Sequence, residues 1–407
     1  MKHSVLHSIG RRQFLQGIGS ASLLALQPAL SWAQAMTHAD YDNRLILIEL
    51  KGGNDGLNTV IPYADSRYTR LRPRLAIARD QVLPVSEQIA LHPELQALLP
   101  LWQEKGLAIV QGVGYPQPNL SHFRSIEIWD TASQSTQYLE SGWLTRAFNE
   151  RSVPKQFAAE GAIIGSQEMG PLIGGARAVA IADTARFIQQ AQQAGFAMQS
   201  QSMGNAALAH LLKTENDIVQ AATQLNGRYT FKTEFPRGAF GDAVKTAMQV
   251  LAAGFDPATQ RMRSGHVAAL RLTLNGFDTH QNQLGTHANL LKQLAEGMVA
   301  LKSALQELNT WNNTLVMTYA EFGRRPKENM SNGTDHGTVA PHFVMGGRVQ
   351  GGLYGKAPAL DQLDGSGNLS YAVDFRNLYS TVLSQWWGIN ATPVLQGKFE
   401  PVGFLKT

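Results

Sequence analysis

The chain has 407 residues, of which 43% are hydrophobic, and a formal net charge of +4. It contains no run of Lys and Arg, so nothing in it indicates binding to nucleic acid or to an anionic membrane surface. It also contains no Cys. Disulfides, thiolate metal ligands and thiol catalysis are therefore excluded, and any metal ion must be bound by His, Asp, Glu or carbonyl groups.

Residues 1–35 have the pattern of a cleavable twin-arginine export signal. Arg11 and Arg12 begin the segment RRQFLQ, a mildly apolar stretch extends to Trp32, and Ala33-Gln34-Ala35 is a small-x-small cleavage site. The alternative is a membrane anchor. A Gln-Pro pair interrupts the apolar stretch, which is shorter than the roughly 20 apolar residues that a spanning helix needs.

Export has consequences for charge and location. The chain from Met36 onward has 372 residues with 32 basic and 31 acidic side chains, because residues 1–35 contain three basic residues and no acid. The sequence thus predicts a periplasmic or secreted protein of nearly balanced charge. Its partner during export is the twin-arginine translocase, and no membrane anchor remains after cleavage.

Short apolar runs along the chain predict strands buried on both faces. These runs are residues 45–50, 107–110, 162–165, 178–181, 267–274, 314–319 and 342–345. Helices are predicted at 121–129, 284–308 and 375–387. Gln and Ala dominate residues 184–262, where strand signals fade, which predicts a helical insertion in a domain spanning 36–407. Strands that alternate with helices predict an α/β fold with a doubly wound, mostly parallel sheet.

Polar side chains that suit a metal ion follow several of these strands. Ligands bind at the carboxyl ends of strands in open α/β sheets. Asp55 follows the first strand, Asp278 and His280 follow the strand at 267–274, and Asp335 and His336 lie beyond the strand at 314–319. A carboxylate and a neutral imidazole are good ligands for zinc or manganese.

Each of these residues also has a simpler interpretation. Asp55 lies in a Gly-rich turn, where Asp is common. Ser121 begins a helix, where it is a frequent N-cap. Asp278 and Asp335 can hydrogen-bond to loop backbone, and His342 can be an ordinary buried residue. Two further pairs, Glu321 with Arg324 and Trp386 with Trp387, can be a structural ion pair and core packing.

Four motifs resemble those of the exported domain-of-unknown-function 1501 family. They are LIELKGGNDGLNT at 47–59, GFDTHQ at 276–281, EFGRR at 321–325 with GTDHG at 333–337, and DFR at 374–376. The resemblance covers essentially the whole chain after the signal. It implies an alkaline-phosphatase-like fold within the alkaline phosphatase and sulfatase superfamily.

The resemblance also implies roles for individual residues. Asp55, Asp278, His280, Asp335 and His336 are similar to the superfamily's ligands for divalent metal, which is Zn, Mn, Mg or Ca. Ser121 is similar to the nucleophile that opens a helix, and Arg124 or Arg324 would stabilise an anionic group. The sequence departs from the superfamily at two points: the 278–280 spacing is short, and no His follows His342.

Two functions are consistent with these patterns. The first is an exported metal-dependent hydrolase of small phosphate or sulfate esters, in which the metal polarises the ester oxygen and lowers the pKa of Ser121 or of water. A formylglycine nucleophile is not expected, because there is no Cys and no Ser followed by Pro-Ser-Arg. The second is a non-catalytic periplasmic binding or assembly protein, which the lack of a downstream His favours.

Overall fold

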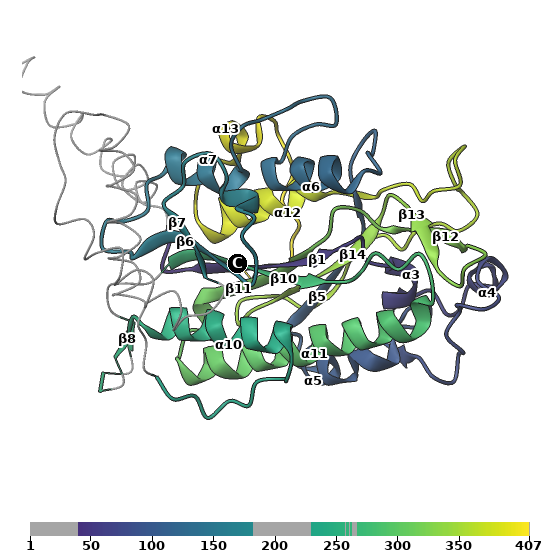
Figure 1. Cartoon of the computed structure of the whole chain (residues 1–407), viewed down its shortest axis with the longest axis horizontal. Helices are drawn as coiled ribbons and strands as arrows, with labels where there is room; N and C mark the ends of the chain where they lie inside the picture. The colour runs from purple at the N-terminus through teal and green to yellow at the C-terminus, as the bar shows by residue number, and fades with distance from the viewer. Residues whose placement is uncertain (1–39, 182–228, 257, 260, 263–266, 407) are drawn as a thin grey trace, which may run out of the picture.

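A computed structural model describes residues 40–181, 229–256, 258–259, 261–262 and 267–406. The predicted export signal lies outside these residues, as does most of the predicted insertion. The architecture has three layers, with a central sheet between two groups of helices (Figure 1).

The central sheet has nine strands among the described residues. In spatial order these are β15 (Gly352–Gly355), β5 (Leu107–Gly114), β14 (Ala340–Met345), β11 (Thr314–Tyr319), β1 (Arg44–Lys51), β10 (Val267–Asn275), β6 (Ala159–Ile164) and β7 (Ala178–Ile181), with β16 (Val373–Asp374) paired to β5. Only β14 is antiparallel to its neighbours, β11 and β5. The seven predicted strands are all present, and the predicted mostly parallel sheet is confirmed.

Helices cover both faces of the sheet (Figure 1). The upper layer in this view contains α6 (His122–Thr131), α7 (Trp143–Glu150), α12 (Phe375–Thr381) and α13 (Ala391–Leu395). The lower layer contains α5 (Leu99–Gln103), α10 (Ala239–Ala252) and α11 (Gln283–Glu307). A π-helical turn, η5 (Val382–Trp386), continues α12, so the predicted helix at 375–387 is confirmed.

The remaining elements are short. They are helices α3 (Gly56–Thr59) and α4 (Ser66–Leu71), the 3-10 turns η1 (Pro93–Leu98), η2 (Gly170–Leu172) and η4 (Trp311–Asn313), and three small sheets: β2 (Val60–Ile61) with β4 (Ala90–Leu91) and β3 (Leu83–Pro84), β12 (Arg324–Glu328) with β13 (Thr334–His336), and β8 (Phe255–Asp256) with β9 (Arg261–Met262).

Apolar periodicity explains the layers. In β1 the run LILIEL is buried along its whole length, because helices cover both of its faces. In α11 the buried positions Leu290, Leu294, Met298, Leu301 and Leu305 recur at helical spacing. The two faces of the sheet thus carry separate apolar cores. Trp386 and Trp387 belong to the upper one, as predicted, and His342 is buried.

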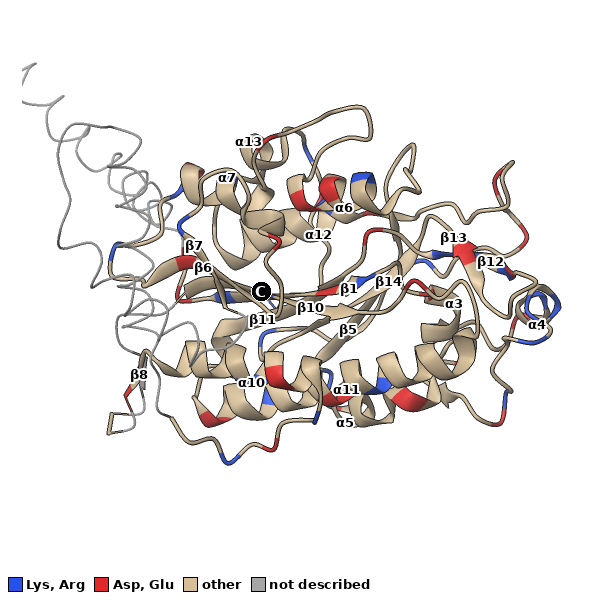
Figure 2. Cartoon of the chain, in the orientation of Figure 1, with Lys and Arg blue, Asp and Glu red and all other residues tan. Residues whose placement is uncertain are grey.

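Acidic and basic residues are interspersed over the helices of both layers (Figure 2). No helix among the described residues is long and apolar enough to cross a membrane. The described part of the predicted insertion contains helix α10, which packs against α11 and β10 in the lower layer, and the small two-stranded sheet of β8 and β9. The boundaries of that insertion stay a prediction, since residues 182–228 lie outside the described residues.

Candidate metal centre

Strand direction brings the polar side chains to one edge of the sheet. Strands β1, β10 and β11 are parallel, and β14 is antiparallel to both β11 and β5, so β5 runs the same way as the other three. The segments that follow these four strands therefore meet at their shared carboxyl edge. These segments carry Asp278 and His280 after β10, Glu321 after β11, and His122 after β5.

Glycine allows the segments to approach closely. Gly52 has φ of +117°, and a Cβ there would lie 2.3 Å from the backbone nitrogen of Asp278. A Cβ at Gly333, in the β12–β13 hairpin, would lie 2.2 Å from the carbonyl carbon of His280. Since real Cβ atoms do not approach so closely, only glycine fits at these positions.

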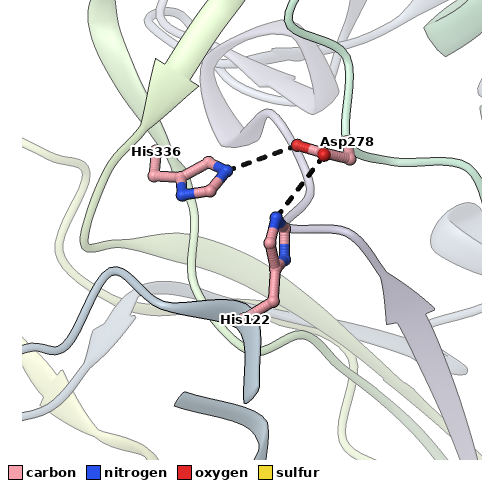
Figure 3. A group of neighbouring side chains, drawn as sticks. All are labelled: His122, Asp278 and His336. Atoms are coloured by element: carbon pink, nitrogen blue, oxygen red, sulfur yellow. Dashed lines mark hydrogen bonds and ion pairs between the residues drawn. The ribbon is translucent and has the colours of Figure 1, made fainter. Parts of the chain in front are cut away.

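Three side chains from distant segments point to a common centre: His122, Asp278 and His336 (Figure 3). Their ligand atoms all lie within 4.8 Å of one another. Asp278 Oδ1 is 3.3 Å from His336 Nε2, and Asp278 Oδ2 is 3.5 Å from His122 Nε2. Ligands about 2.0–2.1 Å from a tetrahedral zinc ion are about 3.4 Å apart, so these separations suit such an ion.

The second nitrogen of each imidazole has a fixed partner. His336 Nδ1 donates to the carbonyl oxygen of Leu120 at 2.8 Å. His122 Nδ1 lies 2.9 Å from Glu321 Oε1, which also accepts the Gly52 N–H. Because carbonyl and carboxylate oxygens accept, both Nδ1 atoms carry the proton, and the Nε2 atoms are left to face Asp278. Metal-ligating histidines have this arrangement of outer partners.

Electrostatics around the centre favour an ionised Asp278 and a neutral His336, whereas the charged form of His122 is favoured. Desolvation would raise the pKa of Asp278, but the hydrogen bond and charge of Arg324 outweigh it and lower the pKa. Burial, followed by the charge of Arg324, lowers the pKa of His336. The hydrogen bond that His122 donates to the Glu321 carboxylate raises the pKa of His122. A carboxylate facing the Nε2 lone pair of His336 is unfavourable unless a cation or a proton lies between them.

His280 and Asp335 lie beside this centre. His280 Nε2 is 2.9 Å from His336 Nε2 and 3.2 Å from Asp278 Oδ1, while its Nδ1 is 3.5 Å from Asp335 Oδ1. Four of the five predicted metal ligands therefore meet: Asp278, His280, Asp335 and His336.

The fifth predicted ligand, Asp55, is not in this group. It is fully buried, and Arg72 Nη1 lies 2.6 Å from its Oδ2, which also accepts a hydrogen bond from Gln283. Desolvation would raise the pKa of Asp55, but the Arg72 charge outweighs it and lowers the pKa. The cation that neutralises this carboxylate is thus an arginine of the chain. Gln283 Oε1 also accepts a hydrogen bond from the Thr334 hydroxyl. Asp55 is therefore linked through Gln283 to β13, the strand that carries Asp335 and His336.

The two predicted anion-binding arginines have other partners. Arg124 Nη2 donates to the carbonyls of Gln134, Ser135 and Gln137, and its Nη1 pairs with Glu127 at 2.9 Å. Arg324 is buried and donates to Asp278 at 2.5 Å and to several backbone carbonyls. In this structure Arg124 secures a loop and Arg324 positions Asp278, and the predicted role of either arginine in stabilising an anionic group stays a prediction.

Ser121 is the exposed N-cap residue of α6. Its backbone nitrogen donates to Asn119 Oδ1, and no partner for its hydroxyl is seen among the described residues. In sequence it lies between Leu120, whose carbonyl accepts a hydrogen bond from His336, and the candidate ligand His122. Its role as nucleophile stays a prediction.

A cleft of about 780 Å³ opens beside the centre. His122, Asp278 and Glu321 line one end of it, and α6 and the segment around Met169 form its walls. A space of this size takes a small organic molecule.

Sequence reasoning missed two members of the centre. His122 directly follows Ser121, which was singled out, and Glu321 was considered only as an ion-pair partner of Arg324. A signal was present for both, because each follows a predicted buried strand.

A family model described as "Protein of unknown function (DUF1501)" matches residues 102–398. The chain belongs to the DUF1501 family. The matched range contains His122, Asp278, Glu321 and His336, and the predicted family membership is confirmed. No match was found among curated proteins.

Solved structures similar to this DUF1501 protein include alkaline-phosphatase-like folds. A protein in the alkaline phosphatase superfamily from Vibrio parahaemolyticus is 10% identical with a TM-score of 0.41, over 88% of this chain and 69% of that one. The C-terminal periplasmic domain of EcEptC from Escherichia coli is 11% identical with a TM-score of 0.35, over 86% and 84%. Alkaline phosphatase from the Antarctic bacterium TAB5 is 13% identical with a TM-score of 0.29, over 77% and 94%.

Proposed function

We propose that this protein is a metal-dependent hydrolase of phosphate or sulfate esters. The observation that carries the proposal is the geometry of His122, Asp278 and His336. Their donor atoms are spaced as ligands of one ion, and both imidazoles have the outer hydrogen-bond partners that metal ligands require.

The donor set favours zinc or manganese over magnesium or calcium, because two of the three ligands are imidazoles. His122, Asp278 and His336 would hold the ion, Glu321 would orient His122, and Arg324 would keep Asp278 ionised and in place. A divalent cation bound here would supply a Lewis acid that polarises an ester oxygen and makes water more acidic.

His280 has the geometry of a proton carrier. Its Nε2 faces the centre, and its Nδ1 faces Asp335. Hydrolysis bonds the oxygen of water to phosphorus or sulfur, which releases one proton from the water, and breaks the bond to the alcohol oxygen, which takes up one proton. His280 would give a proton at Nε2 to the alcohol oxygen and would regain one from the water, while Asp335 faces its Nδ1.

One observation favours the alternative, a non-catalytic binding or assembly protein. Arg124 and Arg324 are engaged with backbone and carboxylate oxygens, and the hydroxyl of Ser121 has no base among the described residues. In that case the ion would have a structural or ligand-binding role.

Metal content and turnover together test the proposal. We expect about one zinc or manganese ion per chain in natively purified protein, and hydrolysis of a p-nitrophenyl phosphate, phosphodiester or sulfate that EDTA abolishes and added metal restores. Asp278→Asn and His336→Ala should lose both metal binding and hydrolysis. The control variant Asp80→Asn, at an exposed residue outside the centre, should keep both. Bound metal with no turnover on any of these esters would favour the alternative, and no bound metal would refute both the centre and the hydrolase.

We also propose that export uses the twin-arginine pathway, with cleavage before Met36. N-terminal sequencing of periplasmic material tests the cleavage site. Unchanged export after Arg11→Lys with Arg12→Lys would refute the pathway.

A further inference from the structure

One lysine lines the cleft beside the metal centre. Lys51 is the one Lys or Arg in this lining among the described residues. Its side chain is 39% exposed, and its Nζ lies 2.7 Å from both carboxylate oxygens of Glu168, whose side chain is 58% exposed. An ion pair between two such exposed groups contributes little to stability, because water competes for both partners. Lys51 can therefore exchange Glu168 for another anion at small cost.

The arginines near the cleft are bound more firmly. Arg271 and Arg324 are buried, and every guanidinium nitrogen of each donates to an oxygen of the chain. Arg124 Nη2 donates to three backbone carbonyls. An anion that takes one of these guanidinium groups must replace buried hydrogen bonds, which is costly because a polar group left unpaired in the interior has lost its water. Lys51 gives up one exposed ion pair instead.

The backbone of Lys51 lies directly beside the metal centre. Its carbonyl accepts the N–H of Phe277 at 3.0 Å, one residue before the candidate ligand Asp278. The next residue, Gly52, donates its N–H at 2.8 Å to Glu321, which is the outer hydrogen-bond partner of one imidazole ligand. The main chain of the lysine is thus fixed to two segments of the centre, and only its flexible side chain has to move.

The side chain of Lys51 extends from the face of the sheet on which the centre lies. Side chains four residues apart in a strand point to the same face, and Leu47 packs in the upper apolar core. Helix α6, which begins at His122, covers this face (Figure 1). His122 and Asp278 line the same cleft as Lys51. An ammonium group on a flexible four-carbon stem can therefore turn from Glu168 toward an anion bound at the centre.

We propose that Lys51 binds the tetrahedral anionic group of the ligand, a phosphate or a sulfate, and that Glu168 occupies its ammonium group when no ligand is bound. The identity of this anion as part of an ester rests on the proposed hydrolase function. The contact with Glu168 shows that the ammonium group takes two oxygens of one anion, and its three donors suit the oxygens of a tetrahedral one. Glu168 thus competes with the ligand for Lys51.

Anion binding by natively purified, full-length protein tests this role. By calorimetry, wild-type protein should bind at least one of two probes, inorganic phosphate and inorganic sulfate. Lys51→Met should weaken that binding about tenfold, because a charged hydrogen-bond donor is lost, and Lys51→Arg should retain most of it. Glu168→Gln should tighten the binding about two- to fivefold, because the competing carboxylate is removed.

A second ion pair of the same kind provides matched controls. Lys302 Nζ lies 2.5 Å from Glu104 Oε2, and both residues lie outside the cleft. Lys302→Met and Glu104→Gln change the charge of the chain by the same amounts and should leave anion binding unchanged. The proposal would be overturned by a wild type that binds neither anion, by equal effects of the two lysine variants, or by unchanged or weaker binding in Glu168→Gln.

Ester hydrolysis separates this inference from the proposed function. On an ester that the wild type hydrolyses, Lys51→Met should raise KM, and Lys302→Met should not. A wild-type KM and wild-type anion affinity in Lys51→Met would refute the role of Lys51 and leave the hydrolase intact. Anion binding that depends on Lys51 and Glu168, without hydrolysis of any ester, would support the anion site and favour the binding protein over the hydrolase.

Discussion

Replacement of Arg72 by Met tests how the fold supports the candidate metal centre. The Arg72 guanidinium is fully buried and makes four hydrogen bonds: to Asp55 Oδ2 at 2.6 Å, Asn58 Oδ1 at 2.9 Å, and the carbonyls of Pro326 at 2.7 Å and Arg325 at 2.9 Å. Without it, Asp55 is a buried carboxylate with no neutralising cation. Removal of one partner of a buried ion pair costs about 3–5 kcal/mol, so we expect Arg72→Met to lose that much unfolding free energy.

The double variant Arg72→Met with Asp55→Asn separates the ion pair from packing. Since no buried charge is left unpaired, its loss should be smaller than the sum of the two single losses by about 2 kcal/mol or more. Urea unfolding followed by circular dichroism measures all four proteins. Additive losses would refute the account of Asp55 as a carboxylate neutralised by Arg72.

The same variants report on the metal centre. Arg72 holds the first residues of β12, and the β12–β13 hairpin carries Asp335 and His336. Zinc affinity should therefore fall in folded Arg72→Met, although Arg72 contacts no metal ligand. A chelator-competition titration at low temperature measures this. Unchanged affinity would mean that the hairpin is held by its other contacts.

Three further changes have defined outcomes. Glu321→Ala should lower metal affinity about 10- to 100-fold in a chelator competition, and Glu321→Gln, which keeps the accepting oxygen, should lower it less. Burial raises the pKa of Asp130 to about 8 against the opposing charge of Arg271, so the folded state binds the proton more tightly. Stability from this group should fall as pH rises from about 4 to 8, by at most about 1.4 kcal/mol per unit, and Asp130→Asn should flatten that slope in urea unfolding at several pH values. Gly52→Ala should abolish metal binding and lower the melting temperature because its Cβ would meet Asp278, whereas Gly365→Ala, in open space, should change neither.

The sequence by itself determined the layered fold. Continuous apolar runs such as residues 45–50 are stable only where both faces of a strand are covered, and the run was found in β1 with helices above and below. It also predicted that these polar side chains meet at strand ends, and Asp278, His280, Asp335 and His336 do lie together there. Local patterns carry this information because strand burial and turn formation depend on neighbouring residues.

Only the tertiary structure decided which charges neutralise one another. Asp55 and Asp278 look alike in sequence, because each is an acid that follows a buried strand and at least one glycine. Asp55 faces Arg72 in a sealed interior, while Asp278 faces two imidazoles at an open cleft. Arg324 is likewise buried, and His122 comes from the segment after β5, whereas Asp278 comes from the segment after β10. These arrangements depend on contacts between distant residues, such as Arg324 and the Gly52 carbonyl, which are 272 positions apart, so no local pattern encodes them.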